Sequence, residues 1–189
     1  MYDGAKHFSI ASFGPEIRDL TVTINGVSKS NSMTGWRIGY AAGNSSLIKA
    51  MSNLQSHSTS NPNSIAQKAT IAALMGPEEA VEEMKEKFSQ RRDRLVELIN
   101  TLDGVSCDKP MGAFYVFADI SGLYGREIAG RKIRSSDDVC DVLLDAARVA
   151  VVPGSGFGAP NYIRFSYSTS MESIEEGMKR IAQVIGVRK

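Results

Sequence analysis

The sequence has few of the residues that build metal sites and disulfide frameworks. It contains two cysteines and two histidines among 189 residues. Cys107 and Cys140 form no Cys-x-x-Cys pair, and two thiols make no disulfide framework. His7 and His57 lie far apart and have no ligand-spaced neighbour. The sequence therefore predicts no metal centre, and its cysteine usage is typical of a reducing cytoplasm.

Neither an excess of charge nor a long apolar run is present. Lys and Arg number 22 against 21 Asp and Glu, which leaves a net charge of +1. That balance gives no electrostatic reason to expect nucleic acid or an anionic membrane as a partner. No run approaches the roughly 20 apolar residues that span a bilayer, and the first residues lack the pattern of a signal peptide. We expect a cytoplasmic protein.

The first part of the chain has too little regular structure to form a sheet of its own. Residues 1–20 are expected to be loop, and strands are predicted at 20–25 and 37–42 on either side of a long polar loop. Ser45 is predicted to cap a helix that runs to about residue 53, and a second helix is predicted over about 63–75. Because two strands are too few for an independent sheet, residues 1–76 are expected to belong to something larger.

A long helix is the clearest element of the sequence. Between residues 77 and 103 apolar residues recur at helical spacing, at Val81, Met84, Phe88, Leu95, Leu98, Ile99 and Leu102. Basic residues alternate there with acidic ones, which indicates a solvated face; they are Lys85, Lys87, Arg91, Arg92 and Arg94. The length suits a helix that connects two domains.

The remainder alternates strands and helices. We predict a strand at 113–119, a helix from Ser135 or Ser136 to about Arg148, and strands at 149–152 and 162–168. A final helix begins after Thr169 or Ser170. Residues 104–189 are therefore expected to form a compact α/β unit, and the chain as a whole an α/β protein.

A lysine and an arginine flank the long polar loop. Lys29 follows the first predicted strand, and Arg37 opens the second, eight residues later. An amine in a cleft can bind an aldehyde, and a guanidinium suits a phosphate. Pyridoxal phosphate requires this pair of groups. On the chemistry alone, a surface lysine and a strand-end arginine remain open as the alternative.

The surrounding residues resemble a known motif. Residues 27–29, Val-Ser-Lys, and residues 33–40, Met-Thr-Gly-Trp-Arg-Ile-Gly-Tyr, are similar to the lysine motif of class I (fold type I) aminotransferases, in particular the bacterial aspartate aminotransferase branch. The resemblance implies that Lys29 carries pyridoxal 5'-phosphate and that Arg37 binds its phosphate. The family often has a phosphate-binding serine where this chain has Gly26, so that contact stays open.

Later stretches match in the same order. Residues 109–117 resemble the strand that begins the family's small domain, and residues 151–158 resemble its glycine-rich turn. Arg164 lies within an apolar strand, where a charge needs an ion-pair partner or a ligand. A structural salt bridge is the plain alternative, whereas the resemblance implies that Arg164 binds the substrate α-carboxylate.

The resemblance also implies how the chain is divided. We expect the C-terminal part of the large cofactor-binding domain, with an incomplete sheet, at residues 1–76, a connecting helix at 77–103 and the small α/β domain at 104–189. The family's cofactor aspartate, asparagine and tyrosine would precede Met1, and Tyr2 would fall just after that tyrosine. A homodimer or a complementing N-terminal half is the expected partner.

The implied reaction is amino transfer between an amino acid, aspartate by the nearest branch, and a 2-oxo acid. The alternative is a non-catalytic truncated module or a split-gene half that is inactive without its complement. An unrelated α/β binding domain is a third reading. The isolated chain is expected to be inactive, because the resemblance places part of the active site outside it.

Overall fold

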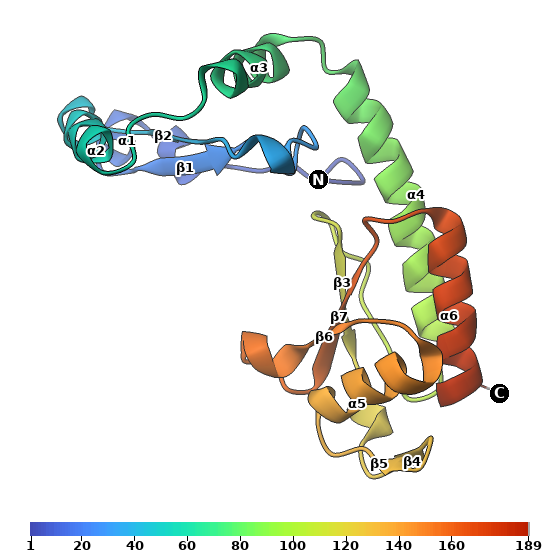
Figure 1. Cartoon of the computed structure of the whole chain (residues 1–189). Coiled ribbons are helices and arrows are strands. Elements are labelled where there is room, and N and C mark those ends of the chain that lie inside the picture. The colour runs from blue at the N-terminus through green and yellow to red at the C-terminus, as the bar shows by residue number, and fades with distance from the viewer. Residues whose placement is uncertain (189) are drawn as a thin grey trace. The chain divides into compact units, whose positions relative to one another are not determined.

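The computed structural model describes residues 1–188, which divide into two units (Figure 1). Lys6–Glu83 form the first, called here the hairpin unit. Met1–Ala5 and the residues from Met84 onward form the second, called here the sheet unit. None of the helices in the described part of the chain is long and apolar enough to cross a membrane.

The hairpin unit is built on two short antiparallel strands. β1 (Thr23–Gly26) pairs with β2 (Gly39–Ala42), with Thr23 opposite Ala42 and Gly26 opposite Gly39. Both predicted strands are confirmed, each beginning two or three residues later than expected. A small core of Val27, Met33, Ile38 and Ala66 lies beyond the end of the hairpin.

Helices follow the hairpin, and their first residues are capped by asparagine. The Asn44 side chain accepts a hydrogen bond from the Ser46 N–H to begin α2 (Ser45–Ser58), so the predicted Ser45 cap was wrong by one residue. The Asn63 side chain similarly begins α3 (Ser64–Met75). The expectation of loop over residues 1–20 was also incomplete, because η1 (Ile10–Ser12) and α1 (Pro15–Asp19) are short helices. The polar loop between the two strands likewise contains a short helix, η2 (Thr34–Trp36).

The sheet unit holds a three-stranded antiparallel sheet of order β3-β7-β6. Its strands are β3 (Tyr115–Asp119), β7 (Tyr162–Ser166) and β6 (Val152–Pro153). The predicted strand at 149–152 is mostly irregular, since only its last residue joins the sheet. A further hairpin, β4 (Glu127–Ile128) with β5 (Arg131–Lys132), was not predicted because two-residue strands carry no period.

Three helices cover one face of this sheet. α4 (Glu79–Thr101) and α6 (Met171–Ile185) lie side by side (Figure 1), and an Arg94–Glu175 ion pair of 3.0 Å joins them. α5 (Ser136–Val142) continues into a π-helical turn, η4 (Leu143–Ala147). The short helices η3 (Ser121–Leu123) and η5 (Gly154–Phe157) lie in the connections.

Alternation along the strands sets the core. Val116, Ala118, Ile163 and Phe165 are buried against the three helices. Their sequence neighbours point to the other face, and Arg164 is among them. That face carries the residue that the sequence singled out as a substrate ligand.

One charged residue corrects the solvated-face interpretation of α4. Arg92 has no exposed surface, because Asp3 and Asp93 pair with its guanidinium at 2.9 and 2.7 Å. The other basic residues of that stretch are partly or fully exposed, so the interpretation holds for them.

Candidate active site

Lys29 lies in the turn that leaves β1. The fully buried Val27 anchors this turn, and the Asn31 N–H donates to the Val27 carbonyl at 3.2 Å. The Asn31 side-chain amide also donates to the Ala73 carbonyl at 3.3 Å, which ties the turn to α3. The exposed Lys29 is therefore presented by a turn that is fixed at both ends.

A cavity of about 810 Å³ opens at this turn, entirely within the hairpin unit. Its lining includes hydroxyl, amide and amine groups, contributed by Asn25, Ser28, Lys29, Ser30, Asn31 and Tyr40. Glu78, just before α4, and Glu82, in its first turn, lie among the other lining residues. The cavity thus offers one primary amine, several neutral hydrogen-bonding groups and two carboxylates.

Gly26 stands where the family often has a serine, and it has a close backbone neighbour. A Cβ at this position would lie 3.0 Å from the Ile38 carbonyl oxygen, because Gly26 pairs closely with Gly39 across the hairpin. A side chain would require the backbone to move. In this chain, a phosphate contact from position 26 could only use the backbone.

Arg37 lies at the same end of the hairpin as Lys29. The register places Gly26 opposite Gly39, so Lys29 follows one strand of the pair and Arg37 precedes the other. Arg37 has left-handed backbone geometry, with φ of 56°, and its Nη1 donates to the Thr34 carbonyl at 2.9 Å. It is exposed and does not line the cavity described above.

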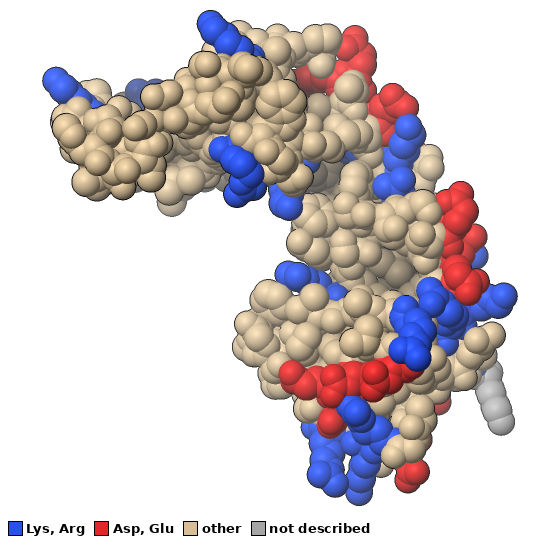
Figure 2. Space-filling model, viewed as in Figure 1, with Lys and Arg blue, Asp and Glu red and all other residues tan. Residues whose placement is uncertain are grey.

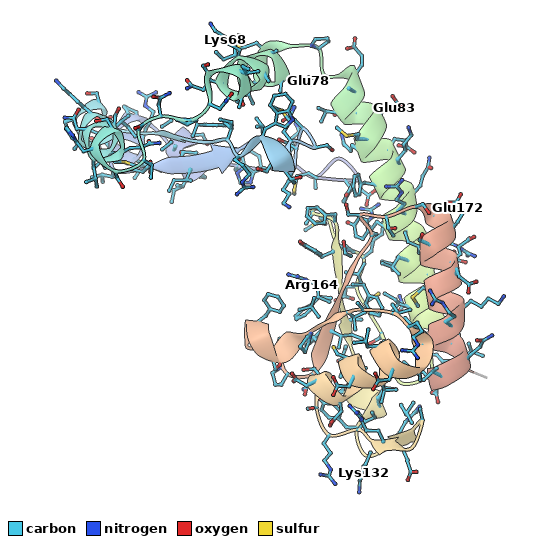
Figure 3. The ribbon with its side chains drawn as sticks, in the orientation of Figure 1. Lys68, Glu78, Glu83, Lys132, Arg164 and Glu172 are labelled. Atoms are coloured by element: carbon cyan, nitrogen blue, oxygen red, sulfur yellow. The ribbon has the colours of Figure 1, made fainter. Side chains whose placement is uncertain are left out.

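Arg164 belongs to the sheet unit, in the middle of β7. It pairs in register with Phe117 of β3 and Val152 of β6. Its guanidinium carbon lies over the rings of Tyr115 and Phe157, at 4.2 and 4.7 Å from their centroids. Within residues 1–188 it has no ion pair or hydrogen bond, so the salt-bridge alternative is not what the structure contains. Arg164 is labelled in Figure 3.

Tyr2 and Arg92 belong to a network that the sequence did not indicate. The buried Tyr2 hydroxyl donates to the Ala113 carbonyl at 2.5 Å, and the Tyr167 hydroxyl donates to the same oxygen at 2.9 Å. Burial and the neighbouring Tyr2 raise the pKa of Tyr167 far above its ordinary value. These contacts secure Met1–Ala5 within the sheet unit.

No metal-binding cluster is found in the described part of the chain, where no three His, Cys, Asp or Glu side chains could hold an ion. The candidate site residues therefore divide between the two units. Lys29 and Arg37 lie at one end of the hairpin, and Arg164 lies on the open face of the three-stranded sheet.

Comparison with known proteins gives long matches. The chain is 52% identical over 188 residues to an aspartate aminotransferase of Geobacillus stearothermophilus, covering 99% of this chain and 47% of that protein. A crystal structure of the aspartate aminotransferase from Rhizobium meliloti superposes with a TM-score of 0.93 at 45% identity, covering 97% of this chain and 46% of that one. The Thermus thermophilus aspartate aminotransferase with maleate gives a TM-score of 0.84 at 39% identity, over 96% and 44%.

These matches confirm the predicted fold, that of part of a fold type I aminotransferase. The chain spans about half the length of the curated relatives that it matches. The model of the family described as aminotransferase class I and II matches residues 1–181, and the chain belongs to this family.

Proposed function

We propose that this chain is the part of a pyridoxal-phosphate-dependent aminotransferase that holds the cofactor lysine and the substrate arginine. The enzyme would move an amino group between aspartate and a 2-oxo acid. The observation that carries the proposal is that Lys29, which lines a cavity, and Arg37 lie at the same end of the hairpin in a chain of this family.

The residues present fit the cofactor. When bound, pyridoxal 5'-phosphate supplies an electron sink for chemistry at the substrate Cα. Lys29 would hold its aldehyde carbon, and Arg37 would bind its phosphate through paired N–H donors. The carboxylates of Glu78 and Glu82 would repel a phosphate dianion within the cavity, so the phosphate is expected outside it, where Arg37 lies at the same end of the hairpin as Lys29.

The chain's own groups would divide the remaining work. Lys29 would accept the proton from the substrate Cα and return it as general base and then general acid. Arg164 would bind the α-carboxylate with two parallel hydrogen bonds and so fix the substrate's orientation. Its lack of an ion-pair partner among residues 1–188 supports a role in binding an anion.

The domain assignment belongs to the same proposal. Residues 1–76 would be part of the large domain, 77–103 the connecting helix and 104–189 the small domain, in a cytoplasmic enzyme. The complete site would form with a second copy or with a polypeptide that supplies the other half. The competing candidate is a module that binds its complement without catalysis. The structural features described above are the same for this candidate, so an activity measurement must separate the two.

Covalent labelling tests the lysine assignment. The chain is co-expressed with the segment of the Geobacillus stearothermophilus enzyme that it does not match, incubated with pyridoxal phosphate and reduced with borohydride. Peptide mass mapping should find the cofactor mass on Lys29, and Lys29→Ala should lose it there. The exposed Lys68 on α3 is the matched control (Figure 3), and Lys68→Ala should keep the label on Lys29. Equal labelling of the two lysines would contradict the proposal.

Turnover of aspartate with 2-oxoglutarate then separates the two candidates. An enzyme should convert both substrates and lose this activity in Lys29→Ala. A complex that assembles and binds the cofactor without turnover would favour the non-catalytic module.

A further inference from the structure

The open face of the three-stranded sheet is unusually aromatic. Alternation places Tyr115, Phe117, Tyr162 and Arg164 on this face, while the intervening residues are buried under the helices. Phe117 stacks on Tyr162 at 4.9 Å between centroids with 19° between the ring planes. Arg164 is thus a cation set among rings.

Phe157 reaches this face from η5, and its position is fixed by the backbone. The Ala159 N–H donates to the Gly154 carbonyl at 2.9 Å, and Gly158 closes the turn with φ of +71°. A Cβ on Gly154 would overlap the Ala159 carbonyl oxygen, so no other residue fits there. This tight turn holds Phe157 against the edge of Phe117 at 6.2 Å and 89°.

Two of these rings hold the guanidinium. The Arg164 Cζ lies 4.2 Å from the Tyr115 centroid and 4.7 Å from the Phe157 centroid, within the range of a cation–π interaction. A ring face attracts the cation but accepts no in-plane hydrogen bond. The N–H donors of Arg164 find no acceptor among the described residues. The rings therefore restrain the charge while its donors stay available.

We propose that Tyr115 and Phe157 are positioning residues for Arg164, which hold its guanidinium so that its donor edge is ready for a substrate carboxylate. This inference rests on the proposed carboxylate role of Arg164. Restraint before binding reduces the entropy lost when the ion pair forms, so the rings would strengthen carboxylate binding without touching the substrate.

Nitrogen-15 NMR of the labelled chain in complex with the unmatched segment of the Geobacillus stearothermophilus relative tests the proposal, because the proposed substrate site is complete only there. The Arg164 Nε signal is assigned by its loss in Arg164→Gln, and its relaxation is measured before maleate is titrated as the dicarboxylate probe. Tyr115→Leu and Phe157→Leu should each increase Nε mobility. Each should also weaken maleate binding roughly twofold to fivefold, as expected for losing one cation–π contact.

Three variants separate positioning from a general structural role. Tyr115→Phe keeps the ring, and the Tyr115 hydroxyl makes no hydrogen bond within residues 1–188, so this variant should behave as wild type. Tyr162→Leu removes a ring of the same face that does not contact Arg164, and should leave Nε mobility unchanged. Phe157 is 53% exposed, so Phe157→Leu tests the idea even if Tyr115→Leu fails to fold.

The outcomes distinguish the two levels of inference. Unchanged Nε mobility in Phe157→Leu and in Tyr115→Leu would overturn the positioning role. A wild-type Arg164 that does not respond to maleate, although the rings restrain it, would instead overturn the carboxylate role in the proposed function.

Discussion

At the scale of single residues, Arg92 is a charged side chain that the fold buries completely. Its guanidinium pairs with Asp3 and Asp93, donates to the Pro110 carbonyl at 3.1 Å and lies 4.5 Å from the centroid of the Tyr2 ring. The sequence places Arg92 in an alternating run of charges and gives no sign that Asp3, 89 residues away, reaches it. Alternating charges along a helix therefore predict exposed side chains only where no residue distant in the sequence pairs with one of them and buries it.

Replacing this arginine should destabilise the sheet unit. Arg92→Met removes hydrogen bonds to charged groups and the anchor of the N-terminal residues, but it leaves two half-exposed carboxylates that water can solvate. We expect a loss of about 2 kcal/mol in the free energy of unfolding, measured by urea denaturation. Lys179→Met, at an exposed position of the neighbouring helix α6, should change it by less than about 0.5 kcal/mol. Equal effects would contradict the assigned role.

The ion pair between Arg92 and Asp3 should make the stability of the fold depend on pH in the acid range. Hydrogen bonds from Arg92 hold the pKa of Asp3 below its ordinary value. A lowered pKa means that the stabilisation is present above the ordinary carboxyl pKa and is lost as the pH falls through the folded value. The stability difference between wild type and Arg92→Met should therefore narrow at low pH. A constant difference from pH about 7 to about 3 would show that Asp3 does not contribute.

The two partly buried thiols should make the stability of the fold decrease at high pH. Burial, with help from neighbouring carboxylates, raises the pKa of Cys107 to about 11 and that of Cys140 to about 12. Above the ordinary thiol pKa of 9.0 the unfolded chain loses protons that the folded chain keeps, so stability falls as the pH rises. Thermal melts from pH about 8 to about 10 should show a smaller decline in a double Cys→Ala variant than in wild type.

At the scale of elements, periodicity and capping residues predicted the helices whose formation depends on local sequence. The long helix and α6 were confirmed, because each has a repeating apolar face, and Ser170 was one of the two residues predicted to cap α6. α3 was confirmed within a residue of its predicted bounds, although its apolar residues do not gather on one face. The π-helical turn after α5 was not predicted, since its residues, with Leu143 and Ala147 buried, carry no sequence pattern that distinguishes it from an α-helix. The contacts of Arg164 also required the fold, because β pairing and the η5 turn bring Tyr115 and Phe157 to it.

The helix α6 contains a glycine whose replacement should stabilise the protein. Gly177 is buried beside a cavity of about 180 Å³, and a Cβ there would meet only the Val149 Cγ2 at 3.7 Å. Gly177→Ala should stabilise the protein by about 1 kcal/mol, since it removes a helix-interior glycine without a clash. Gly186→Ala should destabilise it, because φ of +93° suits only glycine. A lower melting temperature for Gly177→Ala would contradict this packing.

At the scale of the whole molecule, the hairpin unit has more apolar surface than it can bury. Large hydrophobic side chains exposed by half or more include Phe8, Ile10, Phe13, Leu20, Ile24, Leu54, Ile65, Ile71, Leu74 and Met75. Figure 2 shows that much of the visible surface of this unit carries no charge. Its sheet has two strands, each paired on one edge, which leaves the outer edges open. The sequence predicted this weakness from the count of strands.

The exposed apolar surface of the hairpin unit should make copies of the chain associate with one another. The chain alone is expected to elute as a dimer or larger species in size-exclusion chromatography with light scattering, because contiguous apolar surface and open strand edges favour self-association. Leu20→Lys with Leu54→Lys should shift it towards monomer, since these side chains are 86% and 74% exposed on the hairpin unit. Leu144→Lys, at a residue 51% exposed on the sheet unit, is the matched control and should leave the distribution unchanged.

The same surface bears on activity, because Lys29 is presented by the unit whose sheet and core are least complete. We expect the purified chain with added pyridoxal phosphate to show no turnover of aspartate and 2-oxoglutarate. Co-expression with the unmatched segment of the Geobacillus stearothermophilus relative should cover the apolar surface, reduce self-association and restore turnover together. Leu20→Lys with Leu54→Lys should impair this rescue, whereas Leu144→Lys should not. Robust turnover by the chain alone that disappears in Lys29→Ala would show that these residues already form a complete site, and the need for a complement would be wrong.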